Sequence, residues 1–164
     1  TMSQVIDDTT FIGGYESKHM TMIENISRLS YSMYLNEEAY NALKQMYDDL
    51  YKNTKKRFLV TSAYKSYDVL NLEENTSQAG YSEFQLGTSV SLKVNGIKDV
   101  EFVSTDVYQW LLEHSYEYGY VLRYPSDKVT ITQKESCNIF RYVGKENAQK
   151  MHNQNLCLEE LNNQ

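Results

Sequence analysis

The sequence predicts a single α+β domain, and three stretches of the chain carry that prediction. The first is an amphipathic helix, because apolar side chains recur at helical spacing after a capping Asn36. The second is a strictly alternating strand over residues 89–94, which meets a turn-forming Asn-Gly pair. The third is another helix over residues 104–119, where a glycine ends it. At 164 residues the chain has the usual size of one domain.

Local patterns predict the remaining elements. Residues 57–62 are rich in branched and aromatic side chains and predict a strand, and a polar loop follows to residue 80. The Asn-Gly pair predicts a hairpin whose second strand covers 100–103. Further strands are expected over 120–124 and 140–143, and a further helix over 146–161.

The N-terminal part differs from the rest of the chain, because it is polar and only weakly periodic. We therefore expect residues 1–34 to form an extension packed on a core domain over residues 35–164. No repeat or Pro/Gly-rich linker suggests a second domain.

Composition and charge argue against two classes of partner. Lys plus Arg is 16 against 22 Asp plus Glu, a net charge of -6, and no basic cluster could neutralise a phosphate backbone. We therefore expect no nucleic acid partner. No apolar stretch has the length of a membrane span, so this fragment is predicted to have none.

The histidines and cysteines show no spacing typical of a metal or nucleophile site. His19, His114 and His152 lie in separate segments, and Cys137 and Cys157 are far from a C-x-x-C arrangement. A Cys137 nucleophile with His114 as its base would need a third, orienting group. We expect free thiols, or at most one bridge, and no cofactor.

Four blocks, in this order, resemble the VanY-type D-Ala-D-Ala carboxypeptidases, the zinc peptidases that trim the stem peptides of bacterial cell walls. The blocks are SAYKSY at 62–67, GYSEFQLGTSVSL at 80–92, WL with YGYVLRYP at 110–125, and FRYVG at 140–144. The resemblance implies a Hedgehog/DD-peptidase-like fold, which is a small, mostly antiparallel sheet with flanking helices.

The resemblance also implies where zinc would be bound, and this chain departs from the family at each ligand. The family's first His corresponds to Phe84, its Asp to Ser91 and its second His to Ile139. A phenyl ring and an alkyl group cannot bind zinc, and a hydroxyl is a poor neutral ligand. The family's general base, a Glu, corresponds to Ser136, with Glu135 one step away, where a local bulge could restore it.

A residual groove is implied by the residues that the chain shares with the family or replaces closely. Lys65 stands where the family has an Arg, so it keeps the charge without the bidentate fork. The candidate groove residues are Tyr64, Lys65, Ser66, Ser82 and Gln85.

From these departures we hypothesise a bacterial, zinc-free pseudoenzyme with no catalytic residues, which binds a peptidoglycan stem peptide or an envelope protein. The family implies an extracytoplasmic place at the cell envelope. Two alternatives stay open: an active D-Ala-D-Ala carboxypeptidase or other hydrolase with non-standard ligands, and a purely structural subunit of an envelope complex.

Overall fold

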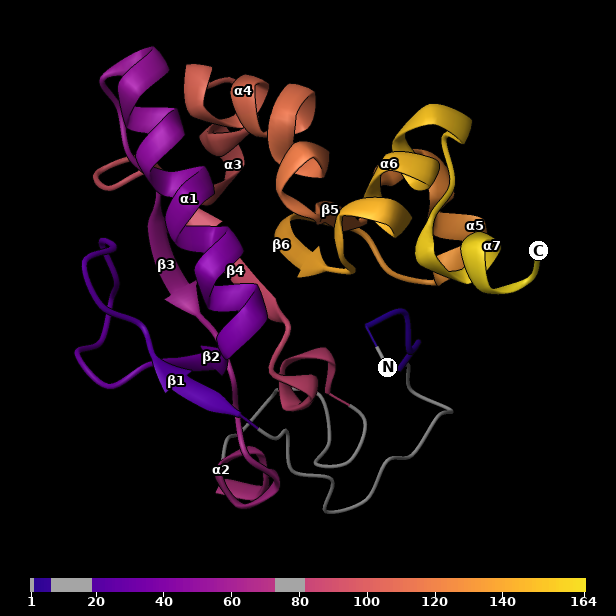
Figure 1. The fold of residues 1–164 in the computed structure, drawn as a ribbon, viewed down its shortest axis with the longest axis horizontal. Helices are drawn as coiled ribbons and strands as arrows, with labels where there is room; N and C mark the ends of the chain where they lie inside the picture. Colours follow the sequence, from indigo (N-terminus) through magenta and orange to yellow (C-terminus); the bar gives the residue numbers. More distant parts are fainter. Residues whose placement is uncertain (1, 7–18, 73–81) are drawn as a thin grey trace.

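The computed structural model describes residues 2–6, 19–72 and 82–164 (Figure 1). At its centre is a four-stranded antiparallel sheet in the order β3-β4-β6-β5. Its strands are β3 (Leu59–Ser62), β4 (Ser89–Lys93), β5 (Tyr120–Tyr124) and β6 (Ser136–Tyr142). The predicted α+β class, with a small antiparallel sheet and flanking helices, is confirmed.

Helices and short strands surround this sheet (Figure 1). The helices that contribute to the main hydrophobic core include α1 (Glu37–Thr54) and α4 (Asp106–His114). The other helices are α2 (Tyr67–Leu72), α3 (Asp99–Phe102), α5 (Val129–Thr132), α6 (Lys145–Gln154) and α7 (Leu158–Asn162). The 3-10 turns are η1 (Glu83–Leu86), η2 (Ser115–Tyr118) and η3 (Ser126–Lys128), and β1 (Met20–Met22) pairs with β2 (Tyr34–Asn36).

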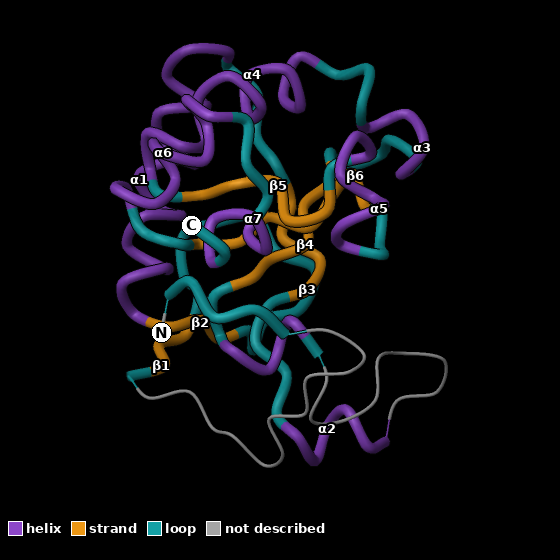
Figure 2. The backbone as a smooth tube through the Cα atoms, turned by 90° about the vertical axis from the view of Figure 1, so that its right-hand side faces the viewer, coloured by secondary structure: helices purple, strands orange, loops and turns teal. Residues whose placement is uncertain are grey.

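The two faces of the sheet differ in chemistry. Side chains alternate between the faces of a strand. On β4, Val90 and Leu92 belong to the main hydrophobic core together with the buried face of α1, which lies to one side of the strands (Figure 2). Ser89 and Ser91, which are also buried, therefore point to the opposite face. Ser91, one of the positions of the candidate site, therefore lies on that second face.

Three of the predicted elements are corrected by the structure. The predicted hairpin is wrong: the Asn-Gly turn forms, with Gly96 at φ 81°, but the chain then enters α3. Val100 is 82% exposed whereas Phe102 is buried, so these two residues do not share one face as they would in a strand. The predicted helix over 146–161 is two helices, because Asn155 adopts a left-handed conformation between them. The predicted loop after β3 contains α2.

The described N-terminal residues contribute directly to the core. Ile23, Ile26 and Met33, around the β1-β2 pair, pack in the main hydrophobic cluster. The division of the chain at residue 35 remains a prediction. None of the described helices has the length and apolar character needed to cross a membrane.

Candidate active site

The three positions that correspond to the family's zinc ligands come from neighbouring elements. Ser91 on β4 and Ile139 on β6 lie opposite each other in the antiparallel register. Phe84 lies in η1, which contacts β4 and ends at a left-handed Gly87. Ser91 is buried, whereas Phe84 and Ile139 are half-buried rather than fully enclosed. The structure therefore brings two of the three positions together as cross-strand partners and places the third on an adjacent turn.

These residues do not fit a zinc ion. Phe84 and Ile139 supply no donor atom, and Ser91 supplies only a hydroxyl, whereas zinc sites are built from thiolate, imidazole and carboxylate groups. In the part of the chain that the structure describes, no three His, Cys, Asp or Glu side chains are grouped so that they could hold a metal ion. No catalytic step is therefore derived through zinc.

Two of the predicted groove residues are local helix caps. The Ser66 and Ser82 hydroxyls accept backbone hydrogen bonds from Val69 and Phe84, each at 3.2 Å, and so begin α2 and η1. Gln85 and Ser82 are buried. The capping role accounts for both serines without any ligand.

Lys65 and Phe84 are direct neighbours. The backbone N–H of Lys65 donates to the carbonyl oxygen of Phe84 at 3.2 Å, and the Lys65 Nζ lies 5.7 Å from the centre of the Phe84 ring. Tyr64, the preceding groove residue, donates its backbone N–H to the Tyr34 carbonyl and so holds the loop to β2. A lysine and a phenyl ring therefore lie side by side at this point of the structure.

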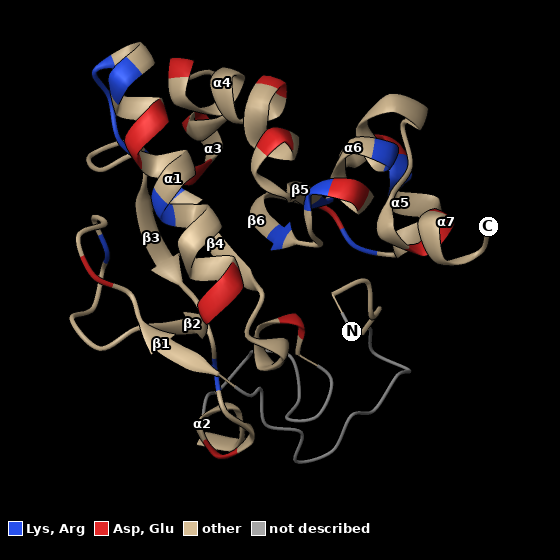
Figure 3. Cartoon of the chain, viewed as in Figure 1, with Lys and Arg blue, Asp and Glu red and all other residues tan. Residues whose placement is uncertain are grey.

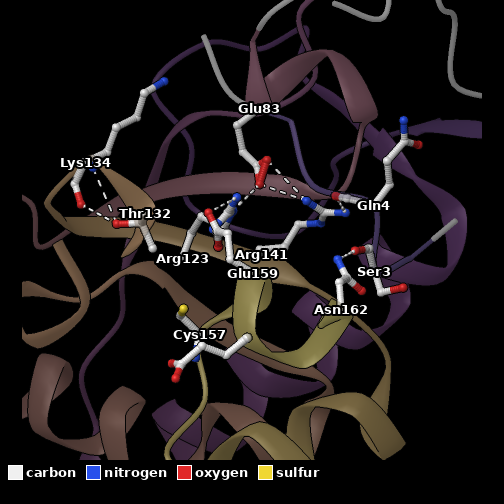
Figure 4. Close-up of polar contacts among 11 residues, drawn as sticks. Ser3, Gln4, Glu83, Arg123, Thr132, Lys134, Arg141, Cys157, Glu159 and Asn162 are labelled. Carbon is white, nitrogen blue, oxygen red and sulfur yellow. Dashed lines mark hydrogen bonds and ion pairs between the residues drawn. The ribbon is translucent and has the colours of Figure 1, made fainter. Parts of the chain in front are cut away.

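A buried ion-pair network underlies η1 (Figure 4). Glu83 Oε1 accepts hydrogen bonds from Arg123 Nε at 2.6 Å and from Arg141 Nη1 at 2.8 Å. Arg123 also donates to both carboxylate oxygens of Glu159 in α7, at 2.8 and 3.3 Å. Three elements that meet at the site, η1, β5 and β6, are thereby joined to the C-terminal helix.

The same network reaches the N-terminal residues. Arg141 Nη2 donates to the carbonyl oxygens of Met2 and Gln4, at 3.0 and 2.8 Å. No local sequence pattern predicts this network as a whole. The available signal was an arginine set between apolar residues in each of two strands, since a charge in such a position is seldom buried without a partner.

A cavity of about 410 Å³ lies at the start of β6 and is lined by both candidates for the general base, Glu135 and Ser136. The pairing of β5 with β6 shifts register here, between the pairs Leu122↔Phe140 and Tyr124↔Ser136. β6 is therefore irregular just after Ser136, close to the position where a bulge could restore Glu135. Glu135 is exposed, and its carboxylate borders this cavity.

The alternative of a cysteine nucleophile gains no support. Burial raises the pKa of the Cys137 thiol, which disfavours the thiolate that would attack. His114 Nδ1 lies 3.1 Å from Glu117, and its ring packs on Trp110. Among the described residues no contact joins Cys137 to His114, and Cys137 and Cys157 are free thiols.

Comparison with known proteins decides the family. The VanY family, described as D-alanyl-D-alanine carboxypeptidase, matches residues 69–145. A D-alanyl-D-alanine carboxypeptidase from Enterococcus faecium is 32% identical over 152 residues, which are 88% of this chain and 49% of the relative. The chain belongs to the VanY carboxypeptidase family.

Solved structures agree with membership of the VanY family. The LdcB LD-carboxypeptidase, whose structure reveals the molecular basis of peptidoglycan recognition, is 28% identical with a TM-score of 0.86, covering 96% of this chain and 84% of its own. A vancomycin resistance D,D-pentapeptidase VanY in complex with Zn(II) is 26% identical with a TM-score of 0.77, covering 98% of both chains. The chain spans between about a third and about half the length of the curated relatives it matches.

These findings correct the expectation that the chain is a pseudoenzyme. The relatives are named carboxypeptidases, and one similar structure is a zinc-bound peptidase, so the proteins that the chain resembles point to an enzyme rather than a pseudoenzyme. The expectation relied on the ligand positions alone. Replacing those side chains leaves the buried network around Glu83 in place.

Proposed function

We propose that this VanY-family chain is a carboxypeptidase that removes a D-alanine from peptidoglycan stem peptides with a residue set different from the family's zinc ligands. The observation that carries the proposal is the buried Glu83 network, because it fixes η1 against β5 and β6. The names of the relatives support the substrate class, since one is a D-alanyl-D-alanine carboxypeptidase and another recognises peptidoglycan.

Lys65 is the proposed contact for the free carboxylate of the substrate. A carboxypeptidase must recognise a C-terminal carboxylate, and an ammonium group binds it as a point charge. Phe84 lies beside Lys65, so its ring offers an apolar surface to the methyl group of a terminal alanine. A lysine in place of the family's arginine predicts a looser hold on the carboxylate.

Glu135 is the proposed general base. Attack of water on a peptide carbonyl needs a group that takes a proton from the water and passes it to the leaving amine. Glu135 supplies a carboxylate at the cavity where β6 begins, whereas its neighbour Ser136 supplies only a hydroxyl. The pairing of β5 with β6 shifts register in this stretch, so the strand is not regular there.

The proposed substrate also implies a location. Stem peptides are part of the bacterial cell wall, so the protein would act outside the membrane, at the cell envelope. The whole protein's partners follow from the same substrate and do not include nucleic acid, in line with the net charge of -6.

The test compares two neighbouring variants on one substrate. The chain is incubated with a stem pentapeptide that ends in D-Ala-D-Ala, and the shortened peptide is followed by mass spectrometry. We expect release of D-alanine, a loss of about a hundredfold in rate for Glu135→Gln, and little change for Ser136→Ala. If Ser136→Ala abolished release and Glu135→Gln did not, the general base would be wrongly assigned. If the unmodified chain released no D-alanine, the proposed function would be wrong.

A further inference from the structure

A second hollow lies away from the candidate active site. Its volume is about 830 Å³, and it is bordered by the loop between β1 and β2, by the middle and end of α1, and by Arg57 just before β3. None of the blocks that resemble the VanY family contributes to its lining, which falls within residues 24–57. Its chemistry is therefore separate from that of the carboxypeptidase site.

The wall of this hollow is fixed by hydrogen bonds rather than left as a loose loop. Ser27 Oγ lies 2.9 Å from the hydroxyl of Tyr47 on α1, and the Ser27 carbonyl accepts from the backbone N–H of Val60 at 2.8 Å. Leu29 in turn donates to the Val60 carbonyl at 2.8 Å. The loop thus pairs with β3 on one side and with α1 on the other, and its lining residues have defined positions.

Two arginines in the lining stack on tyrosines. The guanidinium carbon of Arg57 lies 3.9 Å from the ring centre of Tyr51, and that of Arg28 lies 5.2 Å from the ring centre of Tyr31. Arg28 uses Nε and Nη1 on the carbonyls of Tyr31 and Ile26, which orients its plane. Glu24 and Asp48 also line the hollow, and Asp48 pairs with Lys44. Within the ranges that the structure describes, no ion pair joins either arginine to a carboxylate.

This arrangement selects a particular kind of ligand. Tyr31 and Tyr51 are 78% and 38% exposed, so their hydroxyls and the parts of the rings that the arginines leave open are available to a hydroxylated sugar ring. Arg57 offers a planar fork of donors that suits a carboxylate or a phosphate. We infer that this hollow binds an acidic saccharide, a sugar ring that carries a carboxylate or a phosphate.

Three sugars distinguish the two acidic groups, carboxylate and phosphate, from each other and from an uncharged ring. N-acetylmuramic acid is a sugar with a carboxylate, N-acetylglucosamine 1-phosphate is a sugar with a phosphate, and N-acetylglucosamine has the ring without the charge. The inference does not depend on the proposed cleavage of stem peptides, because binding is measured without turnover.

The experiment is an NMR titration of the full chain with each of these three sugars. We expect at least one acidic sugar to bind about tenfold more tightly than the neutral one, with amide shifts at residues 24–31 and 47–57. Arg57→Gln should lower the affinity for the acidic sugar by about tenfold. Tyr31→Ala should lower the affinity for both the acidic and the neutral sugar. Whichever acidic sugar binds more tightly identifies the charged group.

The matched controls are Lys52→Gln and Tyr34→Ala, which remove an exposed cation and an exposed ring outside the hollow. Both controls should bind the acidic sugar as the unmodified chain does. Equal affinity for the charged and neutral sugars, shifts that map elsewhere, or an Arg57→Gln variant with unchanged affinity would each overturn the inference.

Discussion

The Glu83 carboxylate accepts two hydrogen bonds from Arg141 Nη1, at 2.8 and 3.1 Å, in a site where the arginine is fully buried. Arg123 binds the same carboxylate from β5. Arg141 therefore depends on the Glu83 carboxylate for its ion pair, whereas Arg123 also pairs with Glu159. Removing one partner of a buried ion pair lowers stability by more than the intact pair contributes, because the remaining charge is left buried and unpaired.

We predict that Glu83→Gln lowers the free energy of unfolding by about 3–5 kcal/mol, measured by urea denaturation. The exposed Glu101→Gln change is the control, because it has the same chemistry without burial, and it should stay within about 0.5 kcal/mol of the unmodified chain. A Glu83→Gln variant as stable as the control would show that the network does not hold η1 in place.

Stability should also fall in acid through Glu160. Its pKa is lowered to about 2, first by the hydrogen bond from Lys128 and then by the backbone N–H of Cys157. A carboxyl group with a depressed folded pKa stabilises the fold above its unfolded pKa, and that stability is lost as the pH falls toward the folded value. We expect the unfolding free energy to decline between about pH 4.5 and pH 2, more steeply than in Glu160→Gln. If the unfolding free energies of the two proteins declined equally with falling pH, Glu160 would not be the group responsible.

At alkaline pH the ionisation of tyrosines should dominate the dependence of stability on pH. Burial, aided by the hydrogen bond to Glu38, raises the pKa of Tyr142 to about 12. Because this pKa is raised in the folded state, the stability it contributes is present below about pH 10 and is lost as the pH rises to about 12. Tyr142→Phe should show a shallower decline across this window, as followed by denaturant unfolding at a series of pH values. A variant whose decline is as steep as that of the unmodified chain would argue against this role.

Restoring the family's ligands should create a zinc site. Ser91 and Ile139 already face each other across two strands, so Ser91→Asp and Ile139→His place two donors side by side. With Phe84→His added, we expect about one zinc per chain by metal analysis and a melting temperature that a chelator lowers. The matched control keeps Phe84 and carries only the other two changes, and it should bind zinc more weakly. Equal zinc content in the two variants would show that position 84 does not reach the site.

The sequence predicted the elements with strong periodicity well. The capping Asn36 and the helical spacing after it marked α1 correctly, because that helix buries one continuous apolar face. The Asn-Gly turn is predicted correctly, but the strand expected after it is not. Tertiary packing pairs β4 with β3 and β6 and leaves residues 100–103 without a partner strand. Local pattern alone does not specify which strand pairs with which.

The candidate site was predicted in part. The blocks that resemble the family located Phe84, Ser91 and Ile139, and two of these are cross-strand partners in the structure. The buried network was not found, because its members come from four separate elements and only folding brings Glu83 to Glu159 through Arg123. The loss of three ligands does not by itself decide activity, since the fold that positions a substrate is held by other residues.

The most direct test of the central claim is hydrolysis of a stem pentapeptide in water enriched in ¹⁸O. If the chain is a carboxypeptidase, mass spectrometry will show a tetrapeptide whose new carboxylate carries one heavy oxygen, and the signal will fall by about a hundredfold in Glu135→Gln. A pentapeptide that stays intact, under conditions where the chain is folded, would contradict the claim.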